Sequence, residues 1–344
     1  MNLFHFCFLS ILFPISITSF DFFNHWQCIG ILNKIDFSKP YKINIGDLPL
    51  VIWKDKINNQ FISTINICKH MGSTLDQGKI TDLGCLKCPY HGLEYDKKDG
   101  FGEVLEHEGK LFWAHEPFHK KPFNIPFFNN NAYETSFLEI DMPGSLTDSA
   151  YNTLDLRHPE FVHGSILGFG NNEAAKNIKH FVFNKNKGGK KDQRLGLSFD
   201  YLSNPAITAL NKNVKETNNF HMYLYPSFSW SKVSFDKNNL IIGVNLLPLE
   251  NKKTRWYVTI AHNYYQSPFG KKLMETLASI ILKQDFEQMT KQADETELKK
   301  IMLFEHVFKD EEVIIKLKEI MQNYDYPSIN KCIQLYKYPG NKTI

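Results

Sequence analysis

Two short cysteine–histidine motifs in the first third of the chain constrain its fold more than any other feature of the sequence. Cys68 and His70 form the first motif, and Cys88 and His91 form the second. Thiolate and neutral imidazole both suit iron, and two thiolates on one iron with two imidazoles on the other hold a two-iron, two-sulfur cluster. The chain is therefore expected to place two short hairpin loops side by side, each presenting one cysteine and one histidine.

The residues around these ligands favour tight loops. Gly72 follows the first motif, and Pro89 and Gly92 belong to the second, so both loops contain residues that allow backbone amides to approach the sulfurs. A structural zinc site is the alternative, but zinc fingers usually pair cysteine with cysteine and histidine with histidine at close spacing. We therefore expect one [2Fe-2S] cluster per chain, bound by Cys68, His70, Cys88 and His91.

The paired motifs resemble those of Rieske proteins. Respiratory members of that family carry an extra cysteine in each loop, joined as a disulfide, whereas this chain has Ser73 or a close neighbour and Tyr90 there. Cys85 has no evident partner, so the loops resemble the oxygenase and ferredoxin type, whose cluster is more reducing. In the oxygenases an arginine commonly follows the first histidine; Met71 stands in its place and removes no ligand.

A second group of polar residues lies near the middle of the chain. Read as a helix, Asn152, Asp155 and His158 share one face at spacings of three. Pro159 is expected to bend the chain before His163 and to swing that imidazole toward a shared point. Two histidines and one carboxylate, with coordination positions left open, form the facial triad of non-haem iron(II) oxygenases.

This run resembles the Asn-x-x-Asp-x-x-His-x-x-x-x-His segment of Rieske oxygenases, and the likeness extends from about Trp26 to Gln292. By this resemblance the chain is identified as an oxygenase (alpha) component, similar to the vanillate and dicamba O-demethylase and pheophorbide a oxygenase-like branches. The resemblance implies that His158 and His163 bind one mononuclear Fe(II) per chain.

The same resemblance implies roles for the other polar residues of the run. Asp155 is expected to bridge a ligand histidine to a cluster histidine of a neighbouring subunit in a homotrimer, with His91 as the cluster partner. Asn152 falls where the family often has a polar residue near the iron. Asp155 and Asn152 are therefore the candidate catalytic residues.

The carboxylate ligand is expected from a long helix over residues 269–300. Asp285 fits the position of this ligand in the family, with Glu287 and Asp294 as alternatives. Within this helix, Asp285, Gln288 and Gln292 lie at i, i+3 and i+7, which predicts a polar stripe that points into an otherwise apolar pocket.

The chain is expected to have an α+β fold with two domains. Residues 1–20 form a hydrophobic leader without charged side chains, 21–125 a Rieske [2Fe-2S] domain of short strands, and 126–344 the mononuclear iron domain. A stretch rich in proline and asparagine, residues 117–131, forms the linker. The resemblance implies a helix-grip (START-like) second domain, for which the pattern predicts a helix over 146–156, an exposed loop over 184–194 and antiparallel strands over 221–233, 240–249 and 255–264.

Composition limits the classes of partner and compartment. Hydrophobic residues make up 42% and charged residues 22% of the 344 residues, as in folded globular proteins, and a net charge of +3 gives no basic field for nucleic acid. Six cysteines are too few for a disulfide-rich secreted domain. For the leader, a cleaved targeting peptide, an uncleaved anchor and a misassigned start all remain open, so the compartment is unknown: we expect a soluble intracellular body, with a plastid or membrane association among the alternatives.

The expected function is that of a terminal oxygenase. A ferredoxin or flavin reductase would reduce the cluster, the electron would pass to the mononuclear iron, and O2 would be used to hydroxylate or oxidatively demethylate an aromatic or macrocyclic small molecule. In length the chain resembles the single-subunit-type members of the family, and this resemblance favours a monooxygenase or demethylase over a ring dioxygenase. The alternative functions are a Rieske electron-transfer protein without catalytic iron and a zinc-stabilised binding protein. Four lysines near the cluster loops are either a docking surface for an acidic donor or ordinary solvated side chains: Lys69, Lys87, Lys97 and Lys98.

Overall fold

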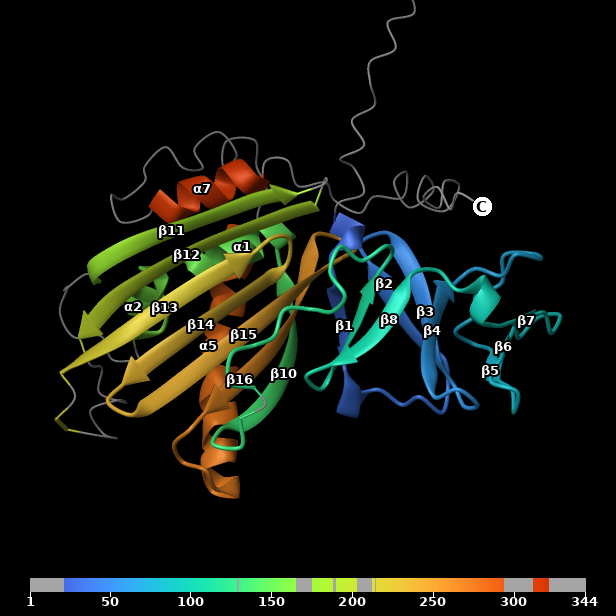
Figure 1. Ribbon diagram of the computed structural model, residues 1–344, viewed down its shortest axis with the longest axis horizontal. Coiled ribbons are helices and arrows are strands. Elements are labelled where there is room, and N and C mark those ends of the chain that lie inside the picture. Colours follow the sequence, from blue (N-terminus) through green and yellow to red (C-terminus); the bar gives the residue numbers. More distant parts are fainter. Residues whose placement is uncertain are drawn as a thin grey trace, which may run out of the picture.

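The computed structural model describes residues 22–128, 130–164, 175–187, 190–202, 212–213, 215–293 and 312–321. The expected leader lies outside these residues, as do Cys7 and Cys332. The described chain forms an all-β part and a larger part in which helices cover a sheet, side by side (Figure 1). This arrangement confirms the α+β fold class. In the described part of the chain, no helix is both long and apolar enough to cross a membrane.

Three small antiparallel sheets, each of three strands, build the N-terminal part. Trp53 and Trp113 fill its interior, and their indole N–H groups donate to the backbone oxygens of Gly84 and Phe101 at 3.0 Å each. The strands are β1 (Gln27–Ile31), β9 (Lys110–Ala114) and β8 (Glu103–His107); β2 (Tyr41–Ile45), β3 (Leu48–Asp55) and β4 (Gln60–Ile65); and β5 (Lys79–Ile80), β6 (Leu86–Lys87) and β7 (Glu94–Tyr95). Single turns of 3-10 helix lie at Phe22–Asn24, Leu32–Lys34 and Lys97–Asp99.

One seven-stranded antiparallel sheet dominates the C-terminal part. In spatial order its strands are β10 (Glu134–Pro143), β16 (Lys253–His262), β15 (Asn238–Leu249), β14 (Phe228–Phe235), β13 (Glu216–Leu224), β12 (Lys190–Leu202) and β11 (Lys176–Lys187). The helices are α1 (Leu146–Leu154), α2 (His158–Val162), α5 (Pro268–Gln292) and α7 (Glu312–Met321). The antiparallel sheet packs against the long C-terminal helix α5, which confirms the expected helix-grip architecture (Figure 1).

One face of this sheet carries the helices. Residues directly paired across antiparallel strands point to the same face, so the face can be followed from strand to strand. On that face Ser136 of β10 donates to Glu275 of α5 at 3.1 Å, and the indole N–H of Trp256 on β16 donates to Ser149 of α1 at 2.9 Å. These contacts hold α1 and α5 over the same side of the sheet.

Three expected elements differ from the structure. Most of the predicted loop at 184–194 belongs to the hairpin of β11 and β12, where Lys187 pairs with Lys190; backbone pairing overrides the low strand propensity of this polar run. The predicted strand at 221–233 is two strands, because the chain turns near Pro226, a residue that lacks the N–H needed for a ladder. The long helix ends at Gln292, and residues 294–300 lie outside the described residues.

The two parts are joined by buried polar contacts as well as apolar packing. Lys110, almost completely buried, donates through Nζ to Thr259 on β16 at 3.0 Å. Ser227 donates to the equally buried side chain of Gln27 on β1 at 2.9 Å. Because a buried ammonium or amide left unpaired is costly, these contacts fix how the N-terminal part sits against β15 and β16. The expected boundary between residues 125 and 126 falls in the segment between β9 and β10 and stays a prediction.

Candidate metal centres

The two cysteine loops have the same backbone construction. Cys68 lies between β4 and β5, and Cys88 lies between β6 and β7. In each loop the cysteine N–H donates to the carbonyl five residues later, of Ser73 or Leu93, at 2.7 and 2.8 Å, and its carbonyl accepts from a glycine N–H four residues later. Gly72 and Gly92 both have φ of 75°, a region that favours glycine. The predicted turn role of these glycines is therefore met in the structure.

The thiols of the two loops lie inside the domain and the imidazoles lie at its surface. Cys68 and Cys88 are both 3% exposed, and their side chains are within hydrogen-bonding reach of one another. The rings of His70 and His91 are exposed, with centroids 4.7 Å apart. Two buried thiols and two adjacent imidazoles match the division of ligands between the two irons of a histidine-ligated cluster.

Tyr95 holds the Cys68 thiol from β7. Its hydroxyl donates to Cys68 Sγ at 3.3 Å and accepts from the backbone N–H of Lys69 at 2.7 Å. Burial raises the pKa of Tyr95 to about 12, so the hydroxyl keeps its proton near neutral pH. Burial works to raise the pKa of the Cys68 thiol, but the hydrogen bonds from Tyr95 and the neighbouring backbone outweigh it and the pKa is lowered. The site therefore favours a thiolate.

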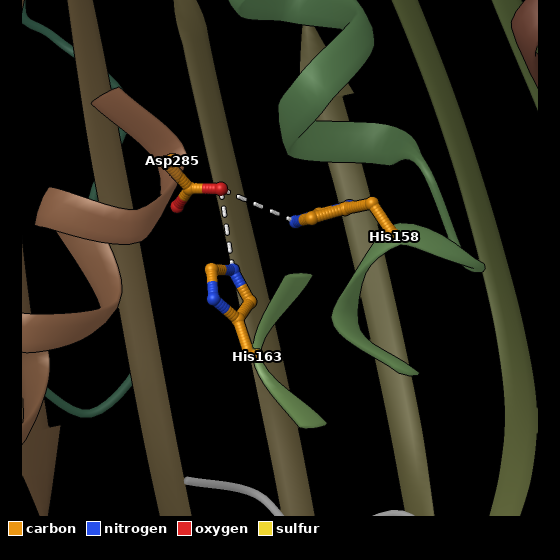
Figure 2. Close-up of side chains that lie close together, drawn as sticks. All are labelled: His158, His163 and Asp285. Carbon is orange, nitrogen blue, oxygen red and sulfur yellow. Dashed lines mark ion pairs between the residues drawn. The ribbon is translucent and has the colours of Figure 1, made fainter. Parts of the chain in front are cut away.

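A second group gathers in the C-terminal part. His158, His163 and Asp285 each bring one donor atom within 4.8 Å of the other two. Asp285 Oδ1 lies 3.6 Å from His158 Nε2 and 3.2 Å from His163 Nε2. Figure 2 shows the carboxylate on α5 facing the two imidazoles, which come from the segment around α2.

Local hydrogen bonds aim both imidazoles at Asp285. His158 Nδ1 lies 3.0 Å from the backbone oxygen of Asp155, and His163 Nδ1 lies 2.9 Å from Oε1 of Gln284. Because an oxygen of either kind can only accept, each Nδ1 donates, and in the neutral ring Nε2 is the nitrogen left with a lone pair for a metal. An imidazole in this tautomer is ready to bind a metal through Nε2.

Charge and burial at this group also suit a cation. Burial lowers the pKa of His158 and favours the neutral, ligating form. Burial also works to lower the pKa of His163, but the hydrogen bond and charge of Asp285 outweigh it, so that pKa is raised. Asn152 donates to Asp285 Oδ1 at 3.3 Å. A carboxylate that is 5% exposed and faces two imidazoles has the donor set of a non-haem iron(II) site.

Comparison with known proteins decides what the N-terminal part is. Residues 25–112 match the family described as Rieske [2Fe-2S] domain. This chain contains a Rieske [2Fe-2S] domain. The matched residues include both cysteine–histidine loops of the Rieske domain and end within β9.

Several curated proteins that match part of this chain are oxygenases by name. Pheophorbide a oxygenase of Oryza sativa subsp. japonica is 22% identical over 284 residues, which cover 71% of this chain and 50% of the relative. The oxygenase component of dicamba O-demethylase from Stenotrophomonas maltophilia is 27% identical over 164 residues, 41% of this chain and 47% of the relative. The chain thus spans about half the length of these relatives.

The fold extends this likeness beyond the Rieske domain. A crystal structure of dicamba monooxygenase bound to 3,6-dichlorosalicylic acid superimposes with a TM-score of 0.69 at 14% identity, covering 92% of this chain and 98% of the other. The chain therefore has the fold of a Rieske oxygenase alpha component, and the recognition made from the sequence is confirmed.

The expected helix through Asn152, Asp155 and His158 is wrong in detail. Helix α1 ends at Leu154, and Asp155 terminates it: its Oδ1 accepts from the N–H groups of Arg157 and His158 at 2.8 and 3.2 Å. Helix α2 begins at His158, with Pro159 in its first turn. The bend thus comes before the proline, at an aspartate whose side chain competes for backbone N–H groups.

The expected polar stripe on α5 is also wrong, although Asp285 itself is buried. Gln288 is half-buried and Gln292 is exposed, and the buried neighbours of Asp285 on this face are Leu282 and Met289. Glu287, one alternative ligand, is exposed, and Asp294 lies outside the described residues. The polar partner that the sequence analysis missed is Gln284; its position beside Asp285 on the helix is the only sequence signal for it.

Tyr95→Phe is expected to lower the reduction potential of the Rieske cluster by about 40 mV. In the wild type the Tyr95 hydrogen bond stabilises the more negative, reduced cluster by about 1 kcal/mol, and the variant loses this stabilisation. For one electron, ~1.4 kcal/mol corresponds to about 59 mV of reduction potential. A spectroscopic redox titration measures the shift. Tyr90→Phe is the control, because it removes an exposed hydroxyl and keeps its ring. Equal potentials in the wild type and Tyr95→Phe would contradict the assignment of Tyr95.

Gln284→Leu is expected to weaken Fe(II) binding at the second centre by about 10- to 100-fold, because His163 loses the acceptor that fixes its tautomer. Dialysis against graded Fe(II), followed by iron analysis at constant sulfide, measures the loss. Gln288→Leu, one turn along the same helix, is expected to bind Fe(II) like the wild type. Unchanged binding in Gln284→Leu would show that the hydrogen bond does not orient the ligand.

Proposed function

We propose that this protein is a terminal oxygenase that takes electrons through its Rieske cluster to a mononuclear Fe(II) held by His158, His163 and Asp285. The observation that carries the proposal is the convergence of His158 Nε2, His163 Nε2 and the Asp285 carboxylate in a chain that has the fold of a Rieske oxygenase. A bound iron(II) would supply the activation of O2. The proposed reaction is hydroxylation or oxidative demethylation of an aromatic or macrocyclic small molecule.

The protein's own part in this reaction is to fix ligands and exclude water. The backbone oxygen of Asp155 and the side chain of Gln284 hold the two imidazoles, and Asn152 holds Asp285. Among the described residues three donor atoms are gathered, which leaves other coordination positions for small molecules. His163 and Asp285 are 3% and 5% exposed, which keeps bulk water from most of the ligand set.

We further propose that the electron crosses between subunits of a homotrimer. Within one chain, the cluster loops beside β5–β7 lie at the opposite end of the molecule from α2 (Figure 1). The Asp155 side chain is one-third exposed at the turn after α1, where a neighbouring subunit can reach it. In the proposed assembly it hydrogen-bonds His91 of the partner subunit while its backbone oxygen holds His158.

The proposed electron donor is a ferredoxin or flavin reductase. The lysines near the cluster give little support for electrostatic docking, because Lys69 pairs with Asp99 at 2.7 Å and Lys87 with Glu94 at 3.3 Å. Apolar side chains are exposed around the two cluster histidines instead: Ile67, Met71, Tyr90 and Leu93. A donor that docks through this surface would show little dependence on salt.

The names of relatives support a monooxygenase-type outcome and a plastid location as proposals. They include a chloroplastic flavonoid 8-hydroxylase from Ocimum basilicum, 22% identical over 180 residues, and the pheophorbide a oxygenase described above. The rival function, an electron carrier without catalytic iron, gives no role to the gathered His158, His163 and Asp285. No basic face suited to nucleic acid is expected from a net charge of +3.

Metal analysis tests the proposal directly. The wild-type chain, produced under low oxygen, is expected to hold about three irons for two acid-labile sulfides. Asp285→Ala is expected to hold about two irons with the visible spectrum of the cluster unchanged, because one of three ligands is gone. Glu287→Ala, an exposed carboxylate on the same helix, is the control and is expected to keep the wild-type ratio. A wild-type ratio near two irons to two sulfides after added Fe(II) would favour the electron carrier.

Asp155→Asn is expected to keep both centres filled and to slow reoxidation of the reduced cluster by O2 about 10- to 100-fold. An asparagine oxygen still accepts from Arg157 and His158, so the turn is preserved while the negative charge proposed to bridge subunits is lost. Stopped-flow absorbance of the chemically reduced cluster measures the rate. Asp148→Asn, in the exposed capping box of α1, is the matched control. Wild-type reoxidation in Asp155→Asn would refute the bridging role.

A further inference from the structure

One half-buried imidazole beside the proposed iron ligands has no role in the function described so far. His221 lies on β13, where it pairs with Leu197 of β12 and Ser231 of β14. The same row of paired residues continues through Ile242 and Ile260 to Ser136, which contacts α5. His221 therefore points to the helix-covered face of the sheet, the face on which His158, His163 and Asp285 are gathered.

The ring of His221 lies between the end of α1 and the iron site. The backbone carbonyl of Thr153, in the last turn of α1, is positioned to accept a hydrogen bond from the ring, and His158 is close enough to influence its protonation. The ring of Phe199 on β12 packs against it, with the two ring centroids 5.1 Å apart. His221 is not one of the three residues whose donor atoms converge within 4.8 Å, so it stands next to the ligand set without belonging to it.

Nδ1 of His221 is buried and has no hydrogen-bond partner among the described residues. The contact with the Thr153 carbonyl therefore falls to Nε2, which must carry the proton, and Nδ1 then presents a lone pair. A buried acceptor without a donor is unfavourable, and structures of proteins seldom leave one unsatisfied.

We propose that His221 is a specificity-determining residue whose Nδ1 accepts a hydrogen bond from an O–H or N–H group of the substrate. This inference rests on the proposed oxygenase function and narrows its substrate class to aromatic or macrocyclic molecules that carry such a donor. A phenolic hydroxyl or the N–H of a nitrogen ring meets the requirement. A methyl ether or N-methyl group at the same place leaves Nδ1 unpaired and adds a methyl group against the sheet.

Matched pairs of small probes test this assignment. The pairs are phenol and anisole, 4-methoxyphenol and 1,4-dimethoxybenzene, and indole and 1-methylindole, titrated calorimetrically into the anaerobic, iron-loaded full chain. In at least one pair the wild type is expected to bind the donor-bearing member about tenfold more tightly, as expected for one hydrogen bond to a buried acceptor.

Variants separate this role from a structural one. His221→Phe keeps a ring and removes the acceptor, so the preference within the pair is expected to vanish, whereas His221→Gln keeps an acceptor oxygen and part of the preference. His107→Gln is the matched control, because His107 also has a buried ring nitrogen without a hydrogen bond but lies on β8, away from the iron site. A purely structural role would weaken both members of a pair equally and leave their ratio unchanged.

Two outcomes overturn the inference. In the first, the wild type shows no preference within any pair, which includes the case in which no probe binds. In the second, the preference survives in His221→Phe. Iron and sulfide are counted on the same samples. About three irons to two sulfides without any preference refutes the role of His221 and leaves the oxygenase proposal intact. About two to two refutes the oxygenase proposal, whatever the probes show.

Discussion

The approach of two imidazoles to the carboxylate of Asp285 is the interaction on which the rest of the site depends. Each imidazole reaches it through Nε2 only because its Nδ1 is already held, by the backbone of Asp155 in one case and by Gln284 in the other. That arrangement needs α1 to end where it does and α5 to lie over the same face of the sheet. The contacts of Trp256 with Ser149 and of Ser136 with Glu275 provide this placement.

The same chain carries a Rieske domain at its other end. Its thiols lie inside, held in part by Tyr95, and its two imidazoles lie outside among exposed apolar side chains. Buried polar contacts of Lys110 and Gln27 fix this domain to the sheet and keep the cluster loops away from α2 (Figure 1). In the proposed homotrimer, this domain would therefore pass its electron to the mononuclear centre of a partner subunit.

Local sequence patterns predicted the parts of the fold whose signals are local. The cysteine loops with their glycines, the alternating strand around Trp256 and the long helix around Asp285 all agree with the structure. Predictions failed where packing or backbone pairing decides. The polar run at 184–194 forms a hairpin because β11 and β12 pair with each other. The polar stripe on α5 did not form, since only Asp285 of its three residues is buried.

The sequence alone determined the cluster motif, the two candidate histidines near Pro159 and the residue type expected to complete their site, because ligand chemistry and short spacing are properties of the chain itself. Tertiary structure decided that Asp285 rather than Glu287 faces those histidines, that Gln284 orients one of them and that His221 lies beside them. These residues are far from the histidines along the chain. Their meeting depends on how one helix and one sheet pack, which no local pattern encodes.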